Sequence, residues 1–533
     1  RFARQGTETE IYARLKSPEI VVTPGQEFSF SINARGTASN DGTDSSLPIH
    51  LYWCGERGAQ LGSPILLKSI EKSTDWKTYS HSFIVPNGAH KGYILITLNQ
   101  SNLPKGTFIE FSNPKIEGNG CKPQAFTPRN LHKFTVAAED FLGHKAIKDF
   151  HILVAPEPRT KNVVTLRHDG AVLVDGKPFF PIGMYAVWKR EHNDFDLDKA
   201  FKELHEAGFN LAHSYNATRD DEYKEFMDAA LRHDVKLFIP GGKGVNSTDI
   251  DEIISDIANE RNHPAVLAWY LSDDTAAYIS PEKLSEINEA VHDIDPTRPT
   301  VQADPGGIKI SRYRPYVNAT DGFLPELYPV STGTPPDMTV PKIITDMKMI
   351  QADLASKGSP AKTIWPIIQY FKGWGGWTRF PTFEELRAMS YESIIHGGNG
   401  ITFYTYIRRR ADNFGVLATP ETWQNMKKVA GELNHLSPVF LAETPKQPQI
   451  VNILSGPQQD AQGHDSISTL YKVIDQKQYL ICANSAFKDV TVNFVLPHAH
   501  RCDVLFEERT LNVSKNSFND TFAPYAVHVY EIR

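Results

Sequence analysis

Residues 263–275 read His263-Pro264-Ala265-Val266-Leu267-Ala268-Trp269-Tyr270-Leu271-Ser272-Asp273-Asp274-Thr275, an apolar run that ends in two adjacent carboxylates. Such a run is typical of a strand buried on both faces, as in a parallel sheet. In a (β/α)8 barrel the loops after the strands converge over one pocket, so reacting groups gather at the carboxyl ends of strands. We therefore expect a barrel strand here, with Asp273 and Asp274 at the rim of the pocket.

Seven further short apolar runs alternate with segments of helical period, which is the pattern of repeated strand–helix units. Neighbouring runs are separated by roughly thirty residues, as an eight-strand barrel requires. Together with the run above, which is the fourth in order, they predict a (β/α)8 barrel over residues 163–442. The seven runs lie near residues 180–182, 211–213, 237–239, 300–302, 322–324, 365–368 and 401–404.

Helix-end signals fall between these runs. Ser280-Pro281 places a cap and an N1 proline before a predicted helix, and Thr382 with Glu385 forms a capping box. Gly208 is placed to end another helix.

The rest of the 533-residue chain alternates polar and apolar residues between turn signals, which predicts β-sandwiches on both sides of the barrel. Since a single core stops growing near roughly 250–300 residues, several domains are expected. We assign residues 1–120 to a β-sandwich, 121–162 to a β-hairpin and linker, and 443–533 to a C-terminal β-sandwich. The expected fold class is thus a (β/α)8 barrel between two β-sandwiches.

Cues in the first domain resemble those of jelly-roll carbohydrate-binding modules. They are Val22-Thr23-Pro24-Gly25, Asp75-Trp76-Lys77-Thr78-Tyr79 and Gly106-Thr107-Phe108-Ile109-Glu110-Phe111. The following hairpin resembles the last hairpin of an immunoglobulin-like domain. Aromatic residues of the sandwich can stack on sugars or fill its core, and we expect mainly core packing. These aromatic residues are Tyr52, Trp53, Trp76 and Tyr79.

Composition and charge narrow the range of partners. The net charge of −7, without a basic tract, disfavours a nucleic-acid partner and favours a neutral or weakly charged ligand. No apolar run reaches the length of about 18 residues that a membrane-spanning helix needs. Compact metal motifs, a glycine-rich phosphate loop and a nucleophile elbow are missing from the sequence, so we expect neither a metal nor a cofactor.

The chain begins at Arg1, which we take as the sign of a processed or trimmed fragment. As a separate expectation, we place the protein outside the cytoplasm, as secreted, periplasmic or at the cell surface. The four cysteines form two pairs along the chain, Cys54 with Cys121 and Cys482 with Cys502. Two disulfides or four buried thiols are both compatible with this spacing.

Three segments resemble the large clan of (β/α)8 glycoside hydrolases: Gly176-Lys177-Pro178-Phe179-Phe180-Pro181-Ile182-Gly183, the strand-four stretch, and Ile401-Thr402-Phe403-Tyr404. The resemblance implies an acid/base carboxylate at the end of strand four, which maps to Asp274. It also implies a nucleophilic glutamate at the end of strand seven, where this sequence has Gln369. An amide cannot serve as that nucleophile.

A second carboxylate must therefore come from elsewhere, since glycoside hydrolysis ordinarily needs two. Glu326, at the end of strand six, lies across the predicted pocket from strand four and is our candidate nucleophile or base. Asp304, which ends strand five, is a weaker substitute, and Asp273 is expected to orient its neighbour. The preferred function is hydrolysis of a poly- or oligosaccharide with Asp274 as general acid.

The substrate-binding candidates are aromatic or polar residues near predicted strand ends. Glycines beside Trp374 and Trp377 predict an exposed loop that stacks on sugar rings, and His213 is placed to bond a hydroxyl. The full set is Tyr185, Trp188, His213, Asp304, Tyr328, Gln369, Trp374, Trp377 and Tyr404.

Two alternatives remain open. The adjacent Asp273-Asp274 pair resembles that of the O-GlcNAc hydrolases, which implies a substrate-assisted N-acetylhexosaminidase that needs no enzymic nucleophile. A barrel that lost the strand-seven carboxylate can instead bind glycans without turnover.

Overall fold

The structure is a computed structural model, and it forms two compact units, Arg1–Glu157 and Pro158–Arg533, which are described separately. The described residues are 2–3, 10–16, 20–22, 24–36, 47–54, 60–71, 73–89, 91–101, 108–118, 131–139, 145–153, 161–187, 195–215, 218–306, 312–355, 361–373, 375–406, 414–445 and 449–533.

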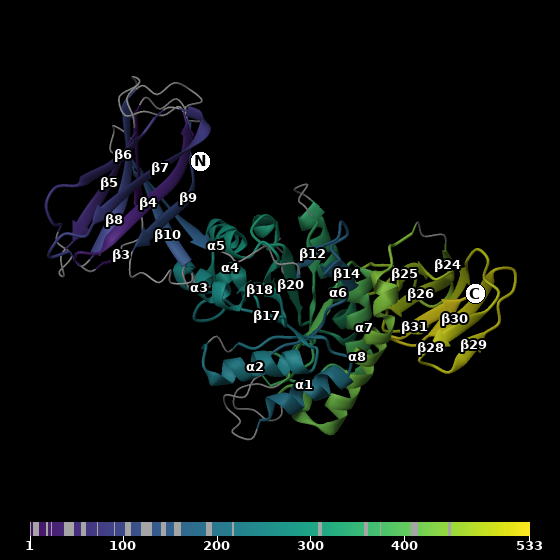
Figure 1. Ribbon diagram of the computed structural model, residues 1–533. Helices are drawn as coiled ribbons and strands as arrows, with labels where there is room; N and C mark the ends of the chain where they lie inside the picture. The colour runs from purple at the N-terminus through teal and green to yellow at the C-terminus, as the bar shows by residue number, and fades with distance from the viewer. Residues whose placement is uncertain are drawn as a thin grey trace. The chain divides into compact units, whose positions relative to one another are not determined.

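The first unit is a β-sandwich, as predicted (Figure 1). One sheet has the order β1 (Phe2–Ala3), β9 (Phe108–Gly118), β4 (Glu27–Gly36) and β7 (Ser73–Ile84). The other has the order β11 (Lys145–Leu153), β10 (Leu131–Glu139), β2 (Glu10–Lys16), β8 (Lys91–Ser101), β5 (Leu47–Cys54) and β6 (Ile65–Ile70), with β3 (Ile20–Val21) beside β8. Alternate residues of β4 enter the core because successive strand side chains point to opposite faces.

The hairpin predicted between residues 121 and 162 exists, since β10 and β11 pair antiparallel over their full length. It is not a separate element, however, because β10 also pairs with β2 and extends the second sheet of the sandwich. An isolated two-stranded hairpin is marginal in water, so joining a sheet stabilises it. Among the aromatic residues, Trp53 and Tyr79 are buried in the core, whereas Trp76 is exposed beneath the guanidinium of Arg35.

The second unit contains a closed parallel barrel of eight strands, which confirms the central prediction. Strand one pairs with strand eight, and strand five pairs with strand six, so no edge remains open. The strands are β15 (Ile182–Met184), β16 (Leu211–Ala212), β17 (Lys236–Ile239), β18 (Val266–Ser272), β19 (Thr300–Pro305), β20 (Gly322–Leu327), β22 (Ile367–Gln369) with β21 (Thr363–Ile364), and β23 (Ile401–Tyr404). The seventh strand is split in two, and Pro366, which lacks an amide hydrogen, lies at the break.

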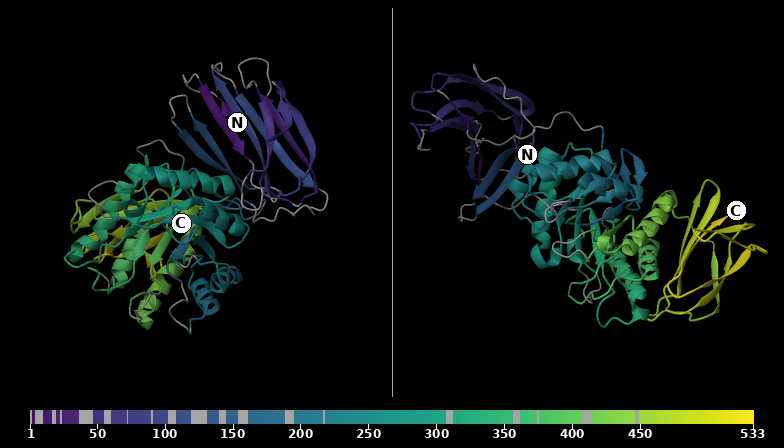
Figure 2. Two further views of the ribbon diagram at one scale, coloured as in Figure 1. Left: turned by 90° about the vertical axis from the view of Figure 1, so that its left-hand side faces the viewer. Right: turned by 90° about the horizontal axis from the view of Figure 1, so that it is seen from below.

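Helices surround the barrel (Figures 1 and 2). They are α1 (Leu197–Glu206), α2 (Asp221–Arg232), α3 (Ile250–Glu260), α4 (Thr275–Tyr278), α5 (Pro281–Ile294), α6 (Thr339–Ala355), α7 (Phe383–Ile395) and α8 (Pro420–Leu441), with the short turns η1 (Arg314–Tyr316), η2 (Pro336–Met338) and η3 (Val416–Ala418). Ser280 caps α5, Thr382 and Glu385 form the predicted capping box of α7, and Gly208 follows α1 at φ +99°.

A small antiparallel sheet precedes the barrel, with the order β12 (Val164–Leu166), β13 (Val172–Val174) and β14 (Lys177–Phe179). Val164 and Val172 pack in one cluster with the barrel side chains Leu267 and Trp365. The sheet is therefore part of the barrel core.

The predicted C-terminal β-sandwich also exists. One sheet contains β24 (Ile450–Ser455), β27 (Val490–Val495) and β30 (Ser517–Phe522), and the other contains β25 (Ile467–Ile474), β26 (Lys477–Asn484), β31 (Val527–Ile532), β28 (Cys502–Leu505) and β29 (Arg509–Leu511). Helices α7 and α8 contact the second of these sheets. Cys54, Cys482 and Cys502 are buried free thiols, and Cys121 lies outside the described residues. No helix within the described ranges has the length and apolar character to cross a membrane.

Candidate active site

Strand four delivers Asp273 to the mouth of the barrel. All residues of β18 are buried up to Ser272, where the strand ends. The side-chain oxygen of Asn246 accepts hydrogen bonds from the Asp273 amide at 2.9 Å and from the Ser272 hydroxyl at 2.6 Å. Asn246 follows strand three with a φ of 71°, a conformation that asparagine tolerates better than most residues. Asn246 thus fixes the position at which strand four stops.

The carboxyl groups of Asp273 and Glu326 lie close enough that each shifts the pKa of the other. They arrive from β18 and β20, two strands separated around the barrel by β19. Burial raises the pKa of Asp273 and raises that of Glu326 well above its ordinary value. Two carboxylates in contact cannot both ionise readily, so the pair shares one proton.

The surroundings of the two carboxyls differ. Hydrogen bonds from Tyr270 and Tyr215 stabilise the charged form of Asp273 and oppose the rise of its pKa. Besides burial, the pKa of Glu326 is raised by the negative charges of Asp273, Asp274 and Asp304. These surroundings favour the charge on Asp273 and the proton on Glu326.

Asp274 occupies a different environment from Asp273. It is exposed, it adopts left-handed backbone angles of φ 49° and ψ 41° immediately before α4, and its side chain does not cap that helix. Only the first residue of the adjacent pair thus lies against Glu326. The acid role predicted for Asp274 stays a prediction, and the geometry favours Asp273 in the catalytic pair.

Asp304 is fully buried, and both of its carboxylate oxygens have partners. One accepts from the Ala276 amide at 3.0 Å and the other faces the Arg312 guanidinium at 3.2 Å. Burial raises the pKa of Asp304 to about 6 despite these contacts. The side chain ties β19 to the first turn of α4, which indicates a supporting role for a residue predicted to bind substrate.

Gln369, at the position that the clan reserves for its nucleophile, has both ends of its amide occupied. Its oxygen accepts from the Val330 amide at 2.9 Å, and its nitrogen donates to the Val330 carbonyl at 3.0 Å. Gln369 is fully buried. It therefore anchors the loop after strand six, and the substrate contact predicted for it would require these two bonds to break.

Aromatic rings surround the carboxyl pair. Tyr185 lies 6.1 Å from Tyr404 between ring centroids, and Tyr404 lies 6.0 Å from Tyr328. Trp377 meets Tyr328 edge-on at 6.0 Å, and its indole N–H donates to the Tyr328 carbonyl at 3.1 Å. Tyr328, Trp377 and Tyr404 are half-buried, so part of each remains accessible, whereas Tyr185 is fully buried. The other two predicted aromatic residues, Trp188 and Trp374, lie outside the described residues.

His213 lies beneath the tyrosines with no exposed surface. Its Nδ1 is 2.9 Å from the Phe238 carbonyl, and its Nε2 has no hydrogen-bond partner in the part of the chain that is described. Burial lowers its pKa to about 3, so the ring is neutral and Nδ1 carries the hydrogen. The hydroxyl bond predicted for His213 stays a prediction, since the ring has no exposed surface.

Three residues of the site were missed from the sequence: Asn246, Tyr215 and Tyr270. The first two follow barrel strands, and Tyr270 lies three positions before Asp273. Position at a strand end was a usable signal for Asn246 and Tyr215. Which side chains reach the Asp273 carboxylate could not be predicted, because they come from neighbouring strands that only the folded barrel brings together.

Within the described ranges, no group of three histidine, cysteine or acidic residues is placed to hold a metal ion. The arrangement is that of a (β/α)8-barrel protein with a proton-sharing carboxyl pair in an aromatic mouth.

Comparison with known proteins gives similarity in structure only. No protein-family model matches the sequence, and no curated protein matches it. Among solved structures, a glycoside hydrolase family 5 protein from Bacteroides vulgatus is 11% identical over 69% of this chain and 93% of its own, with a TM-score of 0.48. An alpha-amylase from Geobacillus thermoleovorans is 10% identical over 66% of this chain and 98% of its own, with a TM-score of 0.44.

A third similar structure, a beta-glucuronidase from Bacteroides uniformis, extends over more of the chain. It is 9% identical over 96% of this chain and 90% of its own, with a TM-score of 0.35. All three proteins are glycoside hydrolases, the class that the sequence motifs resemble.

Proposed function

We propose that this chain is a glycoside hydrolase that cleaves a poly- or oligosaccharide with Asp273 and Glu326 as its two catalytic residues. The observation that carries the proposal is the close pair of carboxyl groups at the ends of strands four and six, each of which shifts the pKa of the other. Placing two like-charged groups together in a partly buried site opposes folding, so such a pair is a candidate for function rather than stability.

Glycoside hydrolysis requires one carboxyl that is protonated near neutral pH and a second that is ionised. Glu326 fits the first role because burial and three neighbouring negative charges raise its pKa. Asp273 fits the second because two tyrosines hydrogen-bond its charged form. In the proposed reaction Glu326 protonates the leaving glycosidic oxygen while Asp273 attacks the anomeric carbon.

We assign retention of the anomeric configuration to this pair. Inverting enzymes hold their carboxyls about 6.5–9.5 Å apart to admit a water molecule, whereas retaining enzymes hold them about 5–5.5 Å apart. The closeness that lets Asp273 and Glu326 shift each other's pKa supports the shorter separation. After the first step Glu326, now ionised, would deprotonate the water that releases the sugar from Asp273.

The barrel mouth supports a sugar ligand. Tyr328, Trp377 and Tyr404 present partly exposed rings beside the carboxyl pair, and sugar C–H faces pack on such rings. The substrate-assisted alternative receives less support, because its Asp273 and Asp274 lie in different environments.

A panel of aryl glycosides and polysaccharides, followed by product analysis, tests the proposal. Asp273→Asn and Glu326→Gln should each reduce kcat by about 10³-fold or more. Asp274→Asn, the matched neighbour, should reduce it by less than about tenfold. Proton NMR of the first product should show the starting anomer.

Turnover that survives both Asp273→Asn and Glu326→Gln would overturn the assignment of the pair. Saturable binding without product over the whole panel would favour the glycan-binding alternative. A strict requirement for an N-acetyl group, together with loss of turnover in Asp274→Asn, would favour substrate assistance.

A further inference from the structure

Tyr278 is the most exposed of the described phenylalanine, tyrosine and tryptophan residues, at 65%. Within the part of the chain that is described, its side chain forms no hydrogen bond and contacts no other ring. A single exposed ring is ordinary on a protein surface, so a role for it must follow from its position. Tyr278 ends α4, the short helix that begins directly after the adjacent aspartates of strand four. The ring thus lies beside the proposed catalytic site.

Tyr278 follows Asp274 by four residues, which is about one helical turn and about 6 Å along a helix axis. Thr275 and Ile279 of the same turn are buried and fix α4 against the barrel, whereas Asp274 and Tyr278 are both exposed. The two residues that follow Thr275 are exposed alanines, which carry only methyl groups. A ligand can therefore lie against the carboxylate and the ring together.

The described residues show no structural use for the carboxylate of Asp274. An aspartate directly before a helix ordinarily caps it, by accepting a hydrogen bond from an amide of the first turn. At α4 the Ala276 amide donates instead to Asp304 at 3.0 Å, and the side chain of Asp274 makes no capping bond. The φ of Asp274 is 49°, in a region that residues other than glycine occupy uncommonly and that recurs at functional sites.

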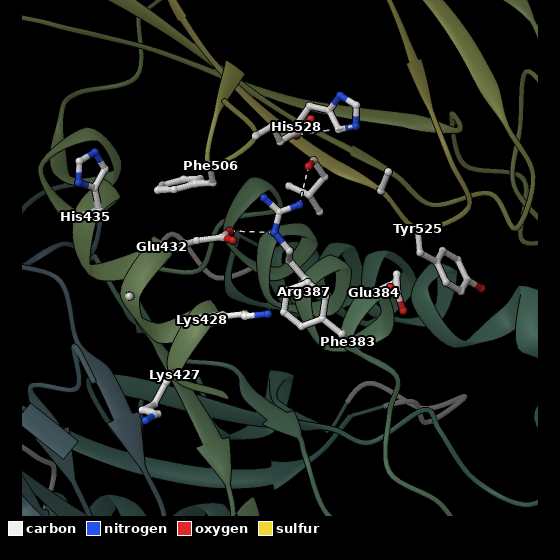
Figure 3. Close-up of a pocket in the computed structure, with 14 residues that line it drawn as sticks. Phe383, Glu384, Arg387, Lys427, Lys428, Glu432, His435, Phe506, Tyr525 and His528 are labelled. Atoms are coloured by element: carbon white, nitrogen blue, oxygen red, sulfur yellow. Dashed lines mark hydrogen bonds and ion pairs between the residues drawn. The ribbon is translucent and has the colours of Figure 1, made fainter. Parts of the chain in front are cut away.

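The groove between α7, α8 and the C-terminal sandwich shows the opposite use of charge. There Arg387 donates to Glu432 at 2.8 Å and to the Val527 carbonyl, which joins the two helices to each other and to the sandwich (Figure 3). Asp274 has no such partner among the described residues. Its negative charge instead raises the pKa of Asp273 and that of Glu326, so it lies near both. A substrate at the carboxyl pair can therefore reach it.

The position of α4 in the barrel places Tyr278 across the mouth from the other aromatic rings. Three strands separate β18 from β23 in either direction around the barrel, so strands four and eight face each other. Strand eight ends at Tyr404, whose ring lies 6.0 Å from that of Tyr328, which in turn meets Trp377. A sugar chain that crosses the mouth past the carboxyl pair would thus meet aromatic rings at both rims.

We propose that Tyr278 and Asp274 form a further sugar subsite at the strand-four rim of the barrel mouth. A neutral sugar unit beyond the reacting bond would pack a C–H face on the Tyr278 ring and donate a hydroxyl to the Asp274 carboxylate. Asp274 would repel a uronate in the same place. This subsite rests on the proposed function, and it specifies an oligosaccharide substrate rather than a single sugar with a small leaving group.

Binding to the Glu326→Gln variant, which should not hydrolyse its ligand, tests the subsite. Isothermal titration compares the disaccharides and pentasaccharides of the cello-, xylo-, manno- and malto- series. At least one pentasaccharide should bind with a Kd below about 1 mM, and about tenfold more tightly than its disaccharide. Adding Tyr278→Ala should weaken that pentasaccharide by about tenfold and its disaccharide by less than about twofold. Adding Asp274→Asn should weaken the pentasaccharide by about threefold to tenfold.

Two controls separate stacking from a change in the fold. Tyr278→Phe keeps the ring and should keep the affinity, and Leu231→Ala, at an exposed position of α2, should leave every Kd unchanged. Because the side chains of Tyr278 and Asp274 have no partners among the described residues, their substitution should move the thermal midpoint by less than about 2 °C.

Failure of all four pentasaccharides to bind up to about 10 mM would overturn the subsite, as would pentasaccharide binding that Tyr278→Ala leaves unchanged. Equal loss of affinity in Tyr278→Phe and Tyr278→Ala would contradict stacking on the ring. Binding that depends on Tyr278, without hydrolysis by the wild type, would refute the proposed function alone. Hydrolysis of di- and pentasaccharides with equal kcat/KM, unaffected by Tyr278→Ala, would refute the subsite alone.

Discussion

The ends of strands four and seven occupy equivalent places in the barrel, yet they hold opposite kinds of side chain. At strand four, Asp273 lies close to a second carboxyl, that of Glu326, and burial raises its pKa. At strand seven, Gln369 has both ends of its amide bonded to the Val330 backbone. The place of a residue in the barrel therefore does not by itself determine its chemical role. A side chain whose hydrogen bonds are already made to the backbone is not free to act on a substrate.

The two regions also act on each other. Val330 lies four residues after Glu326, so the Gln369 amide holds the loop that follows the acid of the proposed pair. Strand seven thus contributes to the site by anchoring strand six, although it supplies no carboxylate. Four sets of variants test this difference between the two strand ends.

The largest effect is expected from Gln369→Glu, which restores the carboxylate typical of the clan. The substitution removes the donor to the Val330 carbonyl and buries a negative charge beside it, so stability should fall by about 2–4 kcal/mol at pH 7. Burial would raise the pKa of the introduced carboxyl above its unfolded value. The loss should therefore shrink as pH falls toward 4, because protonation restores the neutral form.

Chemical denaturation of the Gln369→Glu variant at pH 7 and pH 5 measures this effect. Gln369→Leu is the matched control, since it loses the same bonds without gaining charge and should show no such dependence on pH. A fully stable and more active Gln369→Glu variant would show that strand seven had kept its catalytic geometry.

Tyr270→Phe should change the pH profile of activity. The tyrosine hydrogen bond lowers the pKa of Asp273, so its removal should move the acidic limb of kcat/KM to higher pH, by about one unit. Tyr185→Phe is the control, because Tyr185 donates to Tyr270 at 3.4 Å rather than to the carboxylate. Equal shifts in both variants would argue against a specific role for Tyr270.

Substitution of Asn246 tests how strand four is terminated. Loss of the acceptor for the Asp273 amide should lower kcat by about tenfold with little change in KM, because the carboxylate is displaced rather than removed. Asn246→Gly removes both the side-chain oxygen and the strain of the left-handed backbone conformation, whereas Asn246→Ala removes the oxygen and keeps the strain. Equal loss in both variants would identify the side-chain oxygen as the cause, whereas loss in the alanine variant alone would identify backbone strain.

The smallest effect on activity is expected from Asp304→Asn. The folded state raises the pKa of Asp304 from 3.8 to about 6, so it binds a proton that the unfolded state releases. Stability from this group is present below pH 4 and is lost as pH rises through 6, by up to about 3 kcal/mol. Unfolding midpoints of the variant should therefore change less between pH 4 and pH 6 than those of the wild type. Unfolding midpoints that change equally with pH in the variant and the wild type would contradict the raised pKa of Asp304.

Particular residues show how far sequence reasoning extends into the site. The strand-four run placed Asp273 and Asp274 at the barrel mouth, and counting the strands placed Glu326 across from them, because both inferences use local pattern and the fixed geometry of the barrel. The choice between the two aspartates could not be made this way. It depends on the left-handed turn at Asp274 and on the bond from the Asp273 amide to Asn246, which comes from the end of another strand.

The sequence by itself determined the eight strands, the flanking sandwiches and the strand ends that carry carboxylates, because hydrophobic periodicity and turn signals are local. Only the tertiary structure decided which groups lie together: that Asp273 and Glu326 shift each other's pKa, that Gln369 anchors Val330, and that β10 joins the first sandwich. These outcomes depend on contacts between residues far apart in the chain. Burial and neighbouring charge, which set the pKa values of the site, exist only once those contacts have formed.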